Sequence, residues 1–376
     1  MNVRTVVLTA VVLILIIAFC CEYFYTHNPS SAQEKVSLQR YVIDDAGRNV
    51  TLPANVSRVV AIGPGMLRLI CYLNATDMLV GIEQSELQWG PTGRDYAMAY
   101  YDEFKNLTVI GPGGPGKAPN PELLLSVKPD LIIMSEIYCQ FIDPGTLQRE
   151  VNATVIVLDY GPAGYLDFKE LNNSLTILGI ALNREDRAKS LINYIQSIVD
   201  DLNNRTNNIT MRPKVYVGAV SYKGAQPFTS TQSPFPPLSL LNTKSIADNY
   251  SNKTGFVSLD FEYLISEQPD VVFIDEGNLQ LVKQSFESNP SPYLQLNAFR
   301  NGEVYGILPF NYYDTNIATA LADAYYMGKI LYPDRFKDIN PAEKANEIFN
   351  EFLGKPLYQE YSAAYGGFKC LSNAFG

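Results

Sequence analysis

Apolar strand patterns and helical patterns alternate along most of this chain. In runs such as Arg58–Gly63 and Lys214–Ala219, the positions after the first charged residue are consecutively apolar, without the polar alternation of a half-exposed strand. A strand of this kind is buried on both faces, as in a parallel sheet that helices cover on each side. The pattern therefore predicts an α/β fold with parallel sheets.

One helix–strand unit occurs twice, 140 residues apart. Glu122–Glu136 reappears as Glu262–Glu276, and each copy has a short helical pattern, a Pro-Asp turn and an apolar strand that ends in an acid. The repetition predicts two α/β lobes of similar construction, with a ligand-binding cleft between them. The alternative is a chance similarity between two units of one large sheet.

A mostly helical segment separates the two copies. We expect Asn183 to cap its second helix, which runs for about 20 residues or ~30 Å and is long enough to reach from one lobe to the other. We also expect loops at Gln84–Glu103 and Ser221–Pro237, and a last helix from Asn340 to a stop at Gly354. The predicted organisation is a signal peptide or membrane anchor (1–21), a flexible tether (22–40), an N-terminal lobe (41–165), a helical linker with a single long interlobe helix (166–210) and a C-terminal lobe (211–376).

The N-terminus is basic and then almost unbroken hydrophobe from Val6 to Cys21. Such a stretch suits a signal peptide better than a full membrane span, which needs about 20 residues. Ile17–Cys20 resembles a lipoprotein cleavage site, except that Phe19 stands where a small residue is expected. We expect a membrane tether at the cell surface; an uncleaved helix, a lipid anchor and full release all stay open.

Composition restricts the partners and the chemistry. The chain has 376 residues, 47% of them apolar, and a net charge of −10, which argues against nucleic acid as a partner. The single histidine, His27, lies in the tether, which leaves the folded part without histidine-based catalysis or metal ligation. We therefore expect no enzyme activity, no cofactor and no metal site. Cys71, Cys139 and Cys370 are an odd set, in which one pair could bridge or all could be buried free thiols.

Asn-x-Ser/Thr sequons are more frequent than composition explains, which indicates a glycosylated surface protein. They occur at Asn49, Asn55, Asn74, Asn106, Asn152, Asn172, Asn204, Asn208, Asn249 and Asn252.

Candidate ligand-binding residues follow from the expected sheets, because ligands of open α/β sheets bind beside the carboxyl ends of the strands. Tyrosine is abundant there, and it combines an apolar ring with a hydroxyl that suits ligand binding without chemistry. The candidates are Gly65, Met66, Arg94, Tyr96, Glu136 and Tyr138 in the first lobe, and Ser221, Tyr222, Lys223, Gln226, Thr229, Glu276, Asn311, Tyr312 and Tyr313 in the second.

The order of these elements resembles the class III solute-binding proteins of ABC importers, the iron-siderophore and cobalamin group. The resemblance extends from about Tyr41 to Leu371. It rests on Asp45–Pro53 followed by Arg58-Val-Val, on Leu79-Val-Gly81, on Glu122 and Glu262, each seven residues before a Pro-Asp, on Val257-Ser258, and on Ala298–Tyr305.

The resemblance implies two Rossmann-like lobes with parallel sheets, joined by a single long helix. It also implies a monomer that captures a ligand outside the cell and delivers it to a membrane permease and its ATPase. In such proteins one exposed glutamate per lobe pairs with permease arginines, and Glu122 and Glu262 match those positions; ordinary first-turn helix residues are the alternative. The implied ligand is a metal chelate, a ferric siderophore first and a corrinoid next. The alternative function is a surface sensor or adhesion ectodomain with the same fold. Dense sequons on an importer component indicate an archaeal cell surface.

Overall fold

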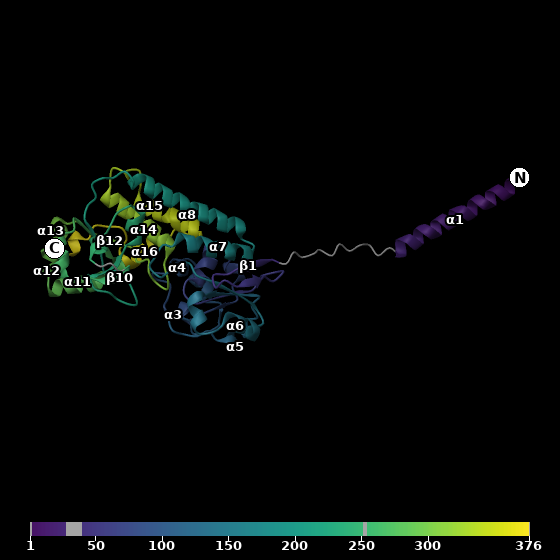
Figure 1. The fold of residues 1–376 in the computed structure, drawn as a ribbon, viewed down its shortest axis with the longest axis horizontal. Coiled ribbons are helices and arrows are strands. Elements are labelled where there is room, and N and C mark those ends of the chain that lie inside the picture. Colours follow the sequence, from purple (N-terminus) through teal and green to yellow (C-terminus); the bar gives the residue numbers. More distant parts are fainter. Residues whose placement is uncertain (1, 28–39, 251–253, 376) are drawn as a thin grey trace. The chain divides into compact units, whose positions relative to one another are not determined.

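Two parallel sheets organise the computed structural model, which describes residues 2–27, 40–250 and 254–375. The first sheet has the order β3-β6-β7 and the second has the order β12-β11-β8, and neighbouring strands within each are parallel. Figure 1 shows both sheets with helices packed around them. The α/β prediction with parallel sheets is confirmed. We call the region around the first sheet the first lobe and the region around the second sheet the second lobe.

The first lobe contains β1 (Tyr41–Ile43), β2 (Asn49–Thr51), β3 (Val59–Ile62), α2 (Met66–Tyr72), η1 (Thr76–Met78), β4 (Gly81–Ile82), α3 (Gln84–Gln88), α4 (Asp95–Phe104), β5 (Thr108–Val109), α5 (Pro121–Ser126), β6 (Leu131–Ser135), η2 (Glu136–Gln140), α6 (Pro144–Val151) and β7 (Thr154–Leu158). The short parallel pair β4–β5 extends the sheet through a bridge between Val59 and Leu79.

Two helices, α7 (Phe168–Leu182) and α8 (Glu185–Thr206), follow the first lobe. The second lobe contains β8 (Val215–Gly218), β9 (Ser230–Ser233), α9 (Pro236–Leu240), η3 (Ile246–Asn249), β10 (Gly255–Ser258), α10 (Phe261–Glu267), β11 (Val271–Asp275), η4 (Glu276–Asn278), α11 (Leu279–Ser288), α12 (Ser291–Leu294), α13 (Asn297–Asn301), β12 (Val304–Ile307), α14 (Ile317–Leu331), α15 (Pro341–Leu353), α16 (Tyr358–Tyr365) and η5 (Ser372–Ala374).

The two repeat units fold alike and are held by the same local devices. Asn120 accepts a hydrogen bond from the Leu123 amide at the start of α5, and Asp260 does the same for Tyr263 at the start of α10. The aspartate of each Pro-Asp turn then accepts hydrogen bonds from backbone amides that precede the neighbouring strand. Asp130 Oδ2 accepts from the Ser57 and Arg58 amides at 2.9 Å, and Asp270 Oδ2 accepts from the Lys214 amide at 2.7 Å.

The core explains why the strands are apolar at every position. In the first sheet, Val60 and Ile132 belong to the buried cluster that includes Leu124 of α5 and Leu147 of α6. Their neighbours along the strands face a larger cluster on the other side of the sheet. That cluster also contains side chains of the second sheet, such as Phe273, so the two lobes share one apolar core.

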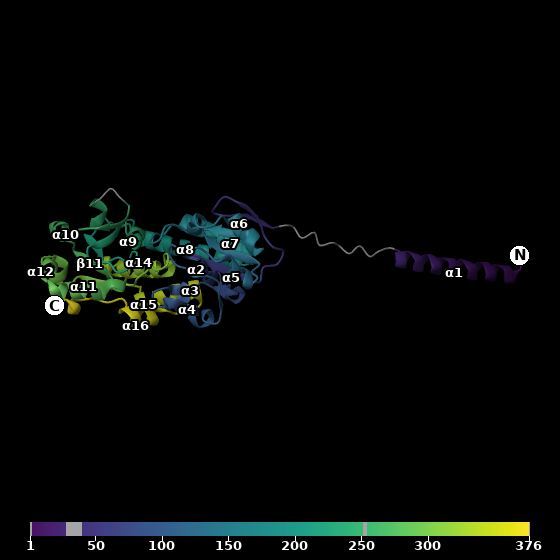
Figure 2. The same ribbon diagram turned by 90° about the horizontal axis from the view of Figure 1, so that it is seen from below.

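Helix α8 has 22 residues and makes polar contacts with both lobes. Near its start, the Arg187 Nε donates to the Tyr72 carbonyl of the first lobe at 3.0 Å. Near its end, the Asn203 carboxamide oxygen accepts from Asn242 of the second lobe at 2.8 Å. Figure 2 shows α8 between the two sets of elements. The assignment of residues 166–210 as a separate linker stays a prediction.

Several local predictions are wrong. Gln84–Glu103 is not a loop, because α3 and the first nine residues of α4 occupy most of it, and Ser221–Pro237 contains β9. Asn183 does not cap α8; it lies in the left-handed region at the end of α7, and Arg184 precedes α8. The helix that ends at Gly354 is not the last, since α16 follows it.

The N-terminal residues form a separate compact unit that contains α1 (Val3–His27). The apolar side chains from Val11 to Phe19 are largely exposed. Among the described residues, no helix combines the length and hydropathy that membrane crossing requires. Much of the predicted tether lies outside the described residues.

Candidate functional site

A buried arginine lies where the lobes meet. Arg68 is the one charged residue of α2, whose seven side chains are all buried. Its guanidinium is fully buried and donates five hydrogen bonds, the full number that an arginine can make. Within the first lobe it contacts Asp95 Oδ1 at 3.0 Å and the Tyr160 hydroxyl at 2.6 Å.

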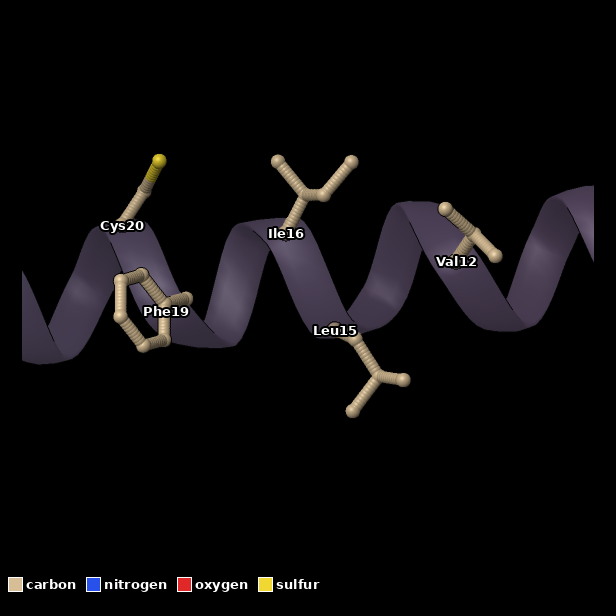
Figure 3. Close-up of a pocket in the computed structure, with 5 residues that line it drawn as sticks. All are labelled: Val12, Leu15, Ile16, Phe19 and Cys20. Atoms are coloured by element: carbon tan, nitrogen blue, oxygen red, sulfur yellow. The ribbon is translucent and has the colours of Figure 1, made fainter.

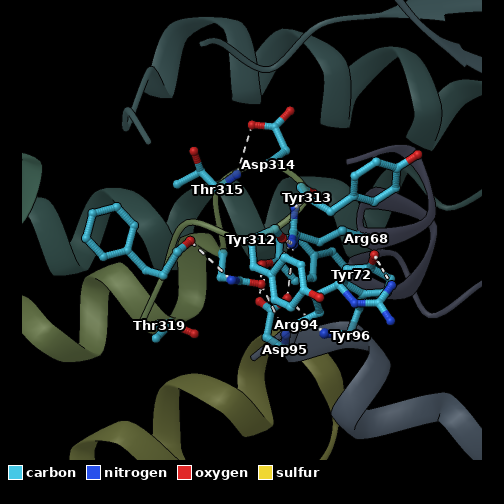
Figure 4. Close-up of polar contacts among 12 residues, drawn as sticks. Arg68, Tyr72, Arg94, Asp95, Tyr96, Tyr312, Tyr313, Asp314, Thr315 and Thr319 are labelled. Atoms are coloured by element: carbon cyan, nitrogen blue, oxygen red, sulfur yellow. Dashed lines mark hydrogen bonds and ion pairs between the residues drawn. The ribbon is translucent and has the colours of Figure 1, made fainter. Parts of the chain in front are cut away.

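The other three acceptors of Arg68 belong to the turn between β12 and α14. They are the carbonyl oxygens of Tyr312 and Tyr313, at 3.1 Å and 3.2 Å, and Asn316 Oδ1 at 2.8 Å. Figure 4 shows this network, with Arg68 and Asp95 facing the turn. Because three of its five acceptors belong to the second lobe, Arg68 connects the two lobes.

The turn itself, residues 311–316, has an unfavourable backbone. Tyr313 and Asp314 are consecutive non-glycine residues with φ of 50° and 75°. Each such residue costs about 1 kcal/mol or more and persists only where the surroundings impose it. Here Arg68 donates hydrogen bonds to the Tyr312 and Tyr313 carbonyls and to Asn316 of the same turn. We call residues 311–316 the interlobe turn.

A buried carboxylate receives the tip of the interlobe turn. Glu83 follows β4, is 4% exposed, and accepts hydrogen bonds from the Gly63 amide at 3.0 Å and the Tyr138 hydroxyl at 3.2 Å. Its third donor is the Tyr313 hydroxyl of the second lobe, at 3.1 Å. Burial raises the pKa of Glu83 to about 7, although the hydrogen bonds oppose the rise.

A second buried ion pair lies beside the first. Arg94 pairs with Glu86, and the Tyr96 hydroxyl also donates to Glu86 at 2.9 Å. The Arg94 guanidinium lies 5.7 Å from the ring centroids of both Trp89 and Tyr312. Burial raises the pKa of Glu86, and the charge of Arg94 opposes this.

Aromatic rings line the outer part of this interface. Trp89 of the first lobe stacks on Tyr312 of the second, with centroids 6.1 Å apart, and Tyr312 is 36% exposed. At another point Gly164, with φ of 86°, donates its amide to the Thr315 hydroxyl at 2.8 Å. A Cβ at Gly164 would lie 2.7 Å from the Phe256 ring, so only glycine permits this close approach of the lobes.

The predicted ligand residues do not form one site. The structure brings Arg94, Tyr96, Tyr138, Tyr312 and Tyr313 together at the lobe interface. Gly65 and Met66 are buried at the start of α2, where a Cβ at Gly65 would lie 2.3 Å from the Tyr160 ring. The rest of the second-lobe set (Ser221, Tyr222, Lys223, Gln226, Thr229 and Asn311) lies on exposed or partly exposed loops.

Those second-lobe loops have their own contacts. Tyr222 stacks on Phe256 with centroids 3.8 Å apart, and Lys223 Nζ lies 5.0 Å from the centroid of the Tyr222 ring. Asn311 Nδ2 donates to the Ser221 carbonyl at 2.7 Å, which ties the interlobe turn to this edge. A cation and stacked rings therefore lie close together at the second-lobe edge.

The two strand-terminal acids differ. Glu136 is exposed after β6. Glu276 is 4% exposed, lies under the C-terminal segment, and accepts from the Gly367 amide at 2.9 Å, while its Oε1 has no partner. Burial raises the pKa of Glu276 to about 8. Glu276 is therefore buried in the second lobe, and its carboxyl group is not exposed at the lobe interface.

Sequence reasoning missed the residues that hold the interface: Arg68, Glu83, Glu86, Asp95 and Asn316. Two signals were present. Arg68 interrupts an otherwise apolar helix, and Glu83 directly follows a short apolar strand. Across the described residues, no group of acids, cysteines or histidine is arranged to hold a metal ion. The cysteines Cys71, Cys139 and Cys370 are free thiols.

A shallow apolar hollow lies along α1, as Figure 3 shows. Val12, Leu15, Ile16, Phe19 and Cys20 line it. It belongs to the surface of one helix and has no polar group to orient a ligand.

The family comparison matches the fold. Residues 59–309 match the family model described as "Periplasmic binding protein". The chain belongs to this family, and it is the substrate-binding component of an ABC transporter rather than an enzyme. The resemblance to class III binding proteins seen in the sequence is confirmed.

Individual relatives are distant but cover most of the chain. The chain is 22% identical to YvrC, an uncharacterized ABC transporter substrate-binding lipoprotein of Bacillus subtilis (82% of this chain, 91% of the relative). It is 24% identical to the Fe(3+)-citrate-binding protein YfmC of the same organism (80% and 87%). It is 23% identical to the molybdate-binding protein MolA of Haemophilus influenzae (89% and 96%). A structure of MolA bound to molybdate aligns with a TM-score of 0.64 at 18% identity, covering 84% of this chain and 98% of that one.

Proposed function

We propose that this protein captures a metal chelate between its lobes, a ferric siderophore first and a corrinoid next, and delivers it to a membrane permease. The observation that carries the proposal is the partly exposed pair of Trp89 and Tyr312, which face each other across the lobes. Flat apolar rings with a hydroxyl suit the organic surface of a chelate. The name of YfmC, an Fe(3+)-citrate-binding protein, supports the same ligand class.

The charge of the interface favours an organic chelate over a bare oxyanion such as the molybdate of MolA. Both buried arginines at the interface are already neutralised, Arg68 by Asp95 and Arg94 by Glu86. Glu83 adds a further buried acid without a paired cation among its hydrogen bonds. A small oxyanion there would meet acids rather than an unpaired arginine.

Delivery is assigned to the two repeated glutamates. Glu122 and Glu262 are both exposed in the first turn of a short helix, and each lies in a repeat unit of the same shape. Exposed ion pairs are individually weak, but a matched pair of acids can orient a partner and speed the encounter. We assign them to permease arginines.

The surface location is proposed from the N-terminus and the sequons. The exposed apolar side chains of α1 support a membrane tether, and YvrC is named as a lipoprotein. Most sequon asparagines are exposed; Asn172 is partly buried, and Asn252 lies outside the described residues. Exposure is what glycosylation requires.

The test is a binding panel on the full-length chain, read by fluorescence of its single tryptophan, Trp89. The panel contains ferric catecholate and hydroxamate chelates, ferric citrate, cobalamin, cobinamide, haemin, molybdate and Fe(III) alone. We expect saturable quenching by one chelate, weakened at least tenfold by Tyr312→Ala. Tyr250→Ala is the matched control, since Tyr250 is similarly exposed at 39% but lies outside the interface.

Saturation by molybdate alone would contradict the chelate class. No saturation by any compound, together with unchanged uptake in Glu122→Ala and Glu262→Ala cells, would favour the alternative of a surface sensor or adhesion ectodomain.

A further inference from the structure

Tyr313 of the second lobe is inserted into the first lobe. It is 8% exposed, and its ring meets Trp89 edge-on with centroids 4.8 Å apart. Its hydroxyl donates to Glu83 Oε2 at 3.1 Å and accepts from the Gly114 amide at 3.1 Å. The lobes cannot separate at this point without breaking both hydrogen bonds and exposing Glu83 to water.

The surroundings of Glu83 contain acids and hydroxyls rather than a paired cation. The titratable groups that face it are Tyr138 from η2, Tyr313 from the interlobe turn and Glu86 from α3, whose own charge is paired with Arg94. The Gly63 amide completes its contacts. Burial without a cation disfavours the charged carboxylate, and hydrogen bonds compensate only in part.

We propose that Glu83 and Tyr313 form a proton-linked latch between the lobes. Glu83 takes up a proton when the lobes close over it and releases that proton when Tyr313 withdraws and water enters. This regulation goes beyond the proposed ligand class and needs no ligand to be tested.

The strained backbone of the interlobe turn gives the latch its second state. Tyr313 and Asp314 hold left-handed conformations that relax once the hydrogen bonds of Arg68 and Glu83 are lost. Strain of this kind is found at clamps and switches, where the closed arrangement imposes it.

The direction of the pH effect follows from the two pKa values. Glu83 has a pKa of about 7 when closed and its ordinary value of 4.5 when exposed. Below pH 4.5 Glu83 is neutral in both states, and its preference for the closed latch is complete. As the pH rises through about 7, this preference is lost. The closure equilibrium should change on the order of a hundredfold across that range.

The experiment follows emission of Trp89 in the ligand-free, full-length protein from pH 5 to 9, because this tryptophan touches Tyr313. We expect a transition between pH 5 and about 7 in the wild type, with a red shift as Tyr313 leaves. Glu83→Gln, which cannot ionise, should abolish it. Tyr313→Phe should move the midpoint to higher pH, because ionised Glu83 loses a donor.

Two controls keep the test specific. Tyr312→Phe removes a hydroxyl from the same turn, and Glu276→Gln removes a buried acid with a raised pKa elsewhere; both should keep the wild-type midpoint. Near-ultraviolet circular dichroism checks that each variant is folded. A flat wild-type profile, or a transition that survives in Glu83→Gln, overturns the latch. If Glu83→Gln does not fold, an unchanged midpoint in Tyr313→Phe overturns it.

Discussion

The two repeat units make the most informative comparison within this molecule. Glu122–Glu136 and Glu262–Glu276 fold into the same helix, turn and strand, yet their final acids have opposite surroundings. Glu136 is exposed, whereas Glu276 is 4% exposed. Similar local sequence therefore specifies similar local structure, but the environment of the last side chain depends on segments far away in the chain.

The difference has a specific structural cause. In the second lobe, Ile274 pairs with Gly306, and a Cβ on that glycine would lie 2.5 Å from Glu276 Oε1. In the first lobe the equivalent pairing is Met134 with Val157. A valine side chain stands in one sheet where the other leaves room for a carboxyl group.

The strongest test of this comparison is to give the second lobe the residue of the first. Gly306→Val should place its side chain against Glu276 and destabilise the fold by roughly 3 kcal/mol or prevent folding, since overpacking costs ~1–3 kcal/mol and a buried acid is also displaced. Guanidinium unfolding followed by circular dichroism measures the loss. The double variant with Glu276→Ala should recover part of it; strictly additive effects would argue against direct contact.

The next effect is a pH dependence confined to one repeat. The pKa of Glu276 is raised to about 8, so stabilisation by its neutral form is complete below pH 4.5 and is lost as the pH rises through about 8. Glu276→Gln should remove roughly 2 kcal/mol of the stability change between pH 5 and pH 9.

Glu136→Gln is the matched control in the other repeat. Its stability profile against pH should follow the wild type, because Glu136 is exposed. If the stability of Glu276→Gln also depends on pH as the wild type does, the burial of Glu276 does not contribute to this pH dependence.

A smaller effect separates the two Pro-Asp turns. Asp130 accepts from two amides and the Ser57 hydroxyl, whereas Asp270 accepts from one amide. Asp130→Ala should cost about 1–2 kcal/mol and Asp270→Ala about 0.5–1 kcal/mol, because a hydrogen bond is worth about 1 kcal/mol net. Urea denaturation of both variants gives the difference. Equal losses would mean that the extra bonds of Asp130 contribute nothing.

The smallest effect on stability belongs to the paired glutamates. Glu122→Ala and Glu262→Ala should each change the unfolding free energy by less than about 0.5 kcal/mol, because both side chains are exposed. Uptake of the bound ligand into cells should nevertheless fall in either variant and fall further in the double variant. Glu150→Ala, also exposed but in neither the docking pair nor the candidate ligand site, serves as the uptake control; a loss of uptake there would deny Glu122 a specific role.

Local sequence patterns predict some residues of the candidate site but not those that connect the two lobes. Tyr138 follows β6 and Tyr313 follows β12, as expected for parallel strands that end at one edge of a sheet, whereas Tyr96 lies within α4. A role of these tyrosines in ligand binding stays a prediction. Arg68 and Glu83 were not found, because their partners lie far away in the chain: Asn316 is 248 residues from Arg68, and Tyr313 is 230 residues from Glu83. No local pattern specifies pairings over such separations.

The sequence by itself determined the α/β class, the buried strands, the repeated unit with its helix caps and Pro-Asp turns, and the family resemblance. These depend on periodicity and on contacts within a few residues, which short-range physics fixes. Only the tertiary structure decided that Arg68 donates three of its five hydrogen bonds to the interlobe turn, that Glu83 meets Tyr313, and that Glu276 is buried while Glu136 is exposed. Those outcomes depend on which distant segments pack together, because burial and pairing of a charged group are properties of its whole surroundings.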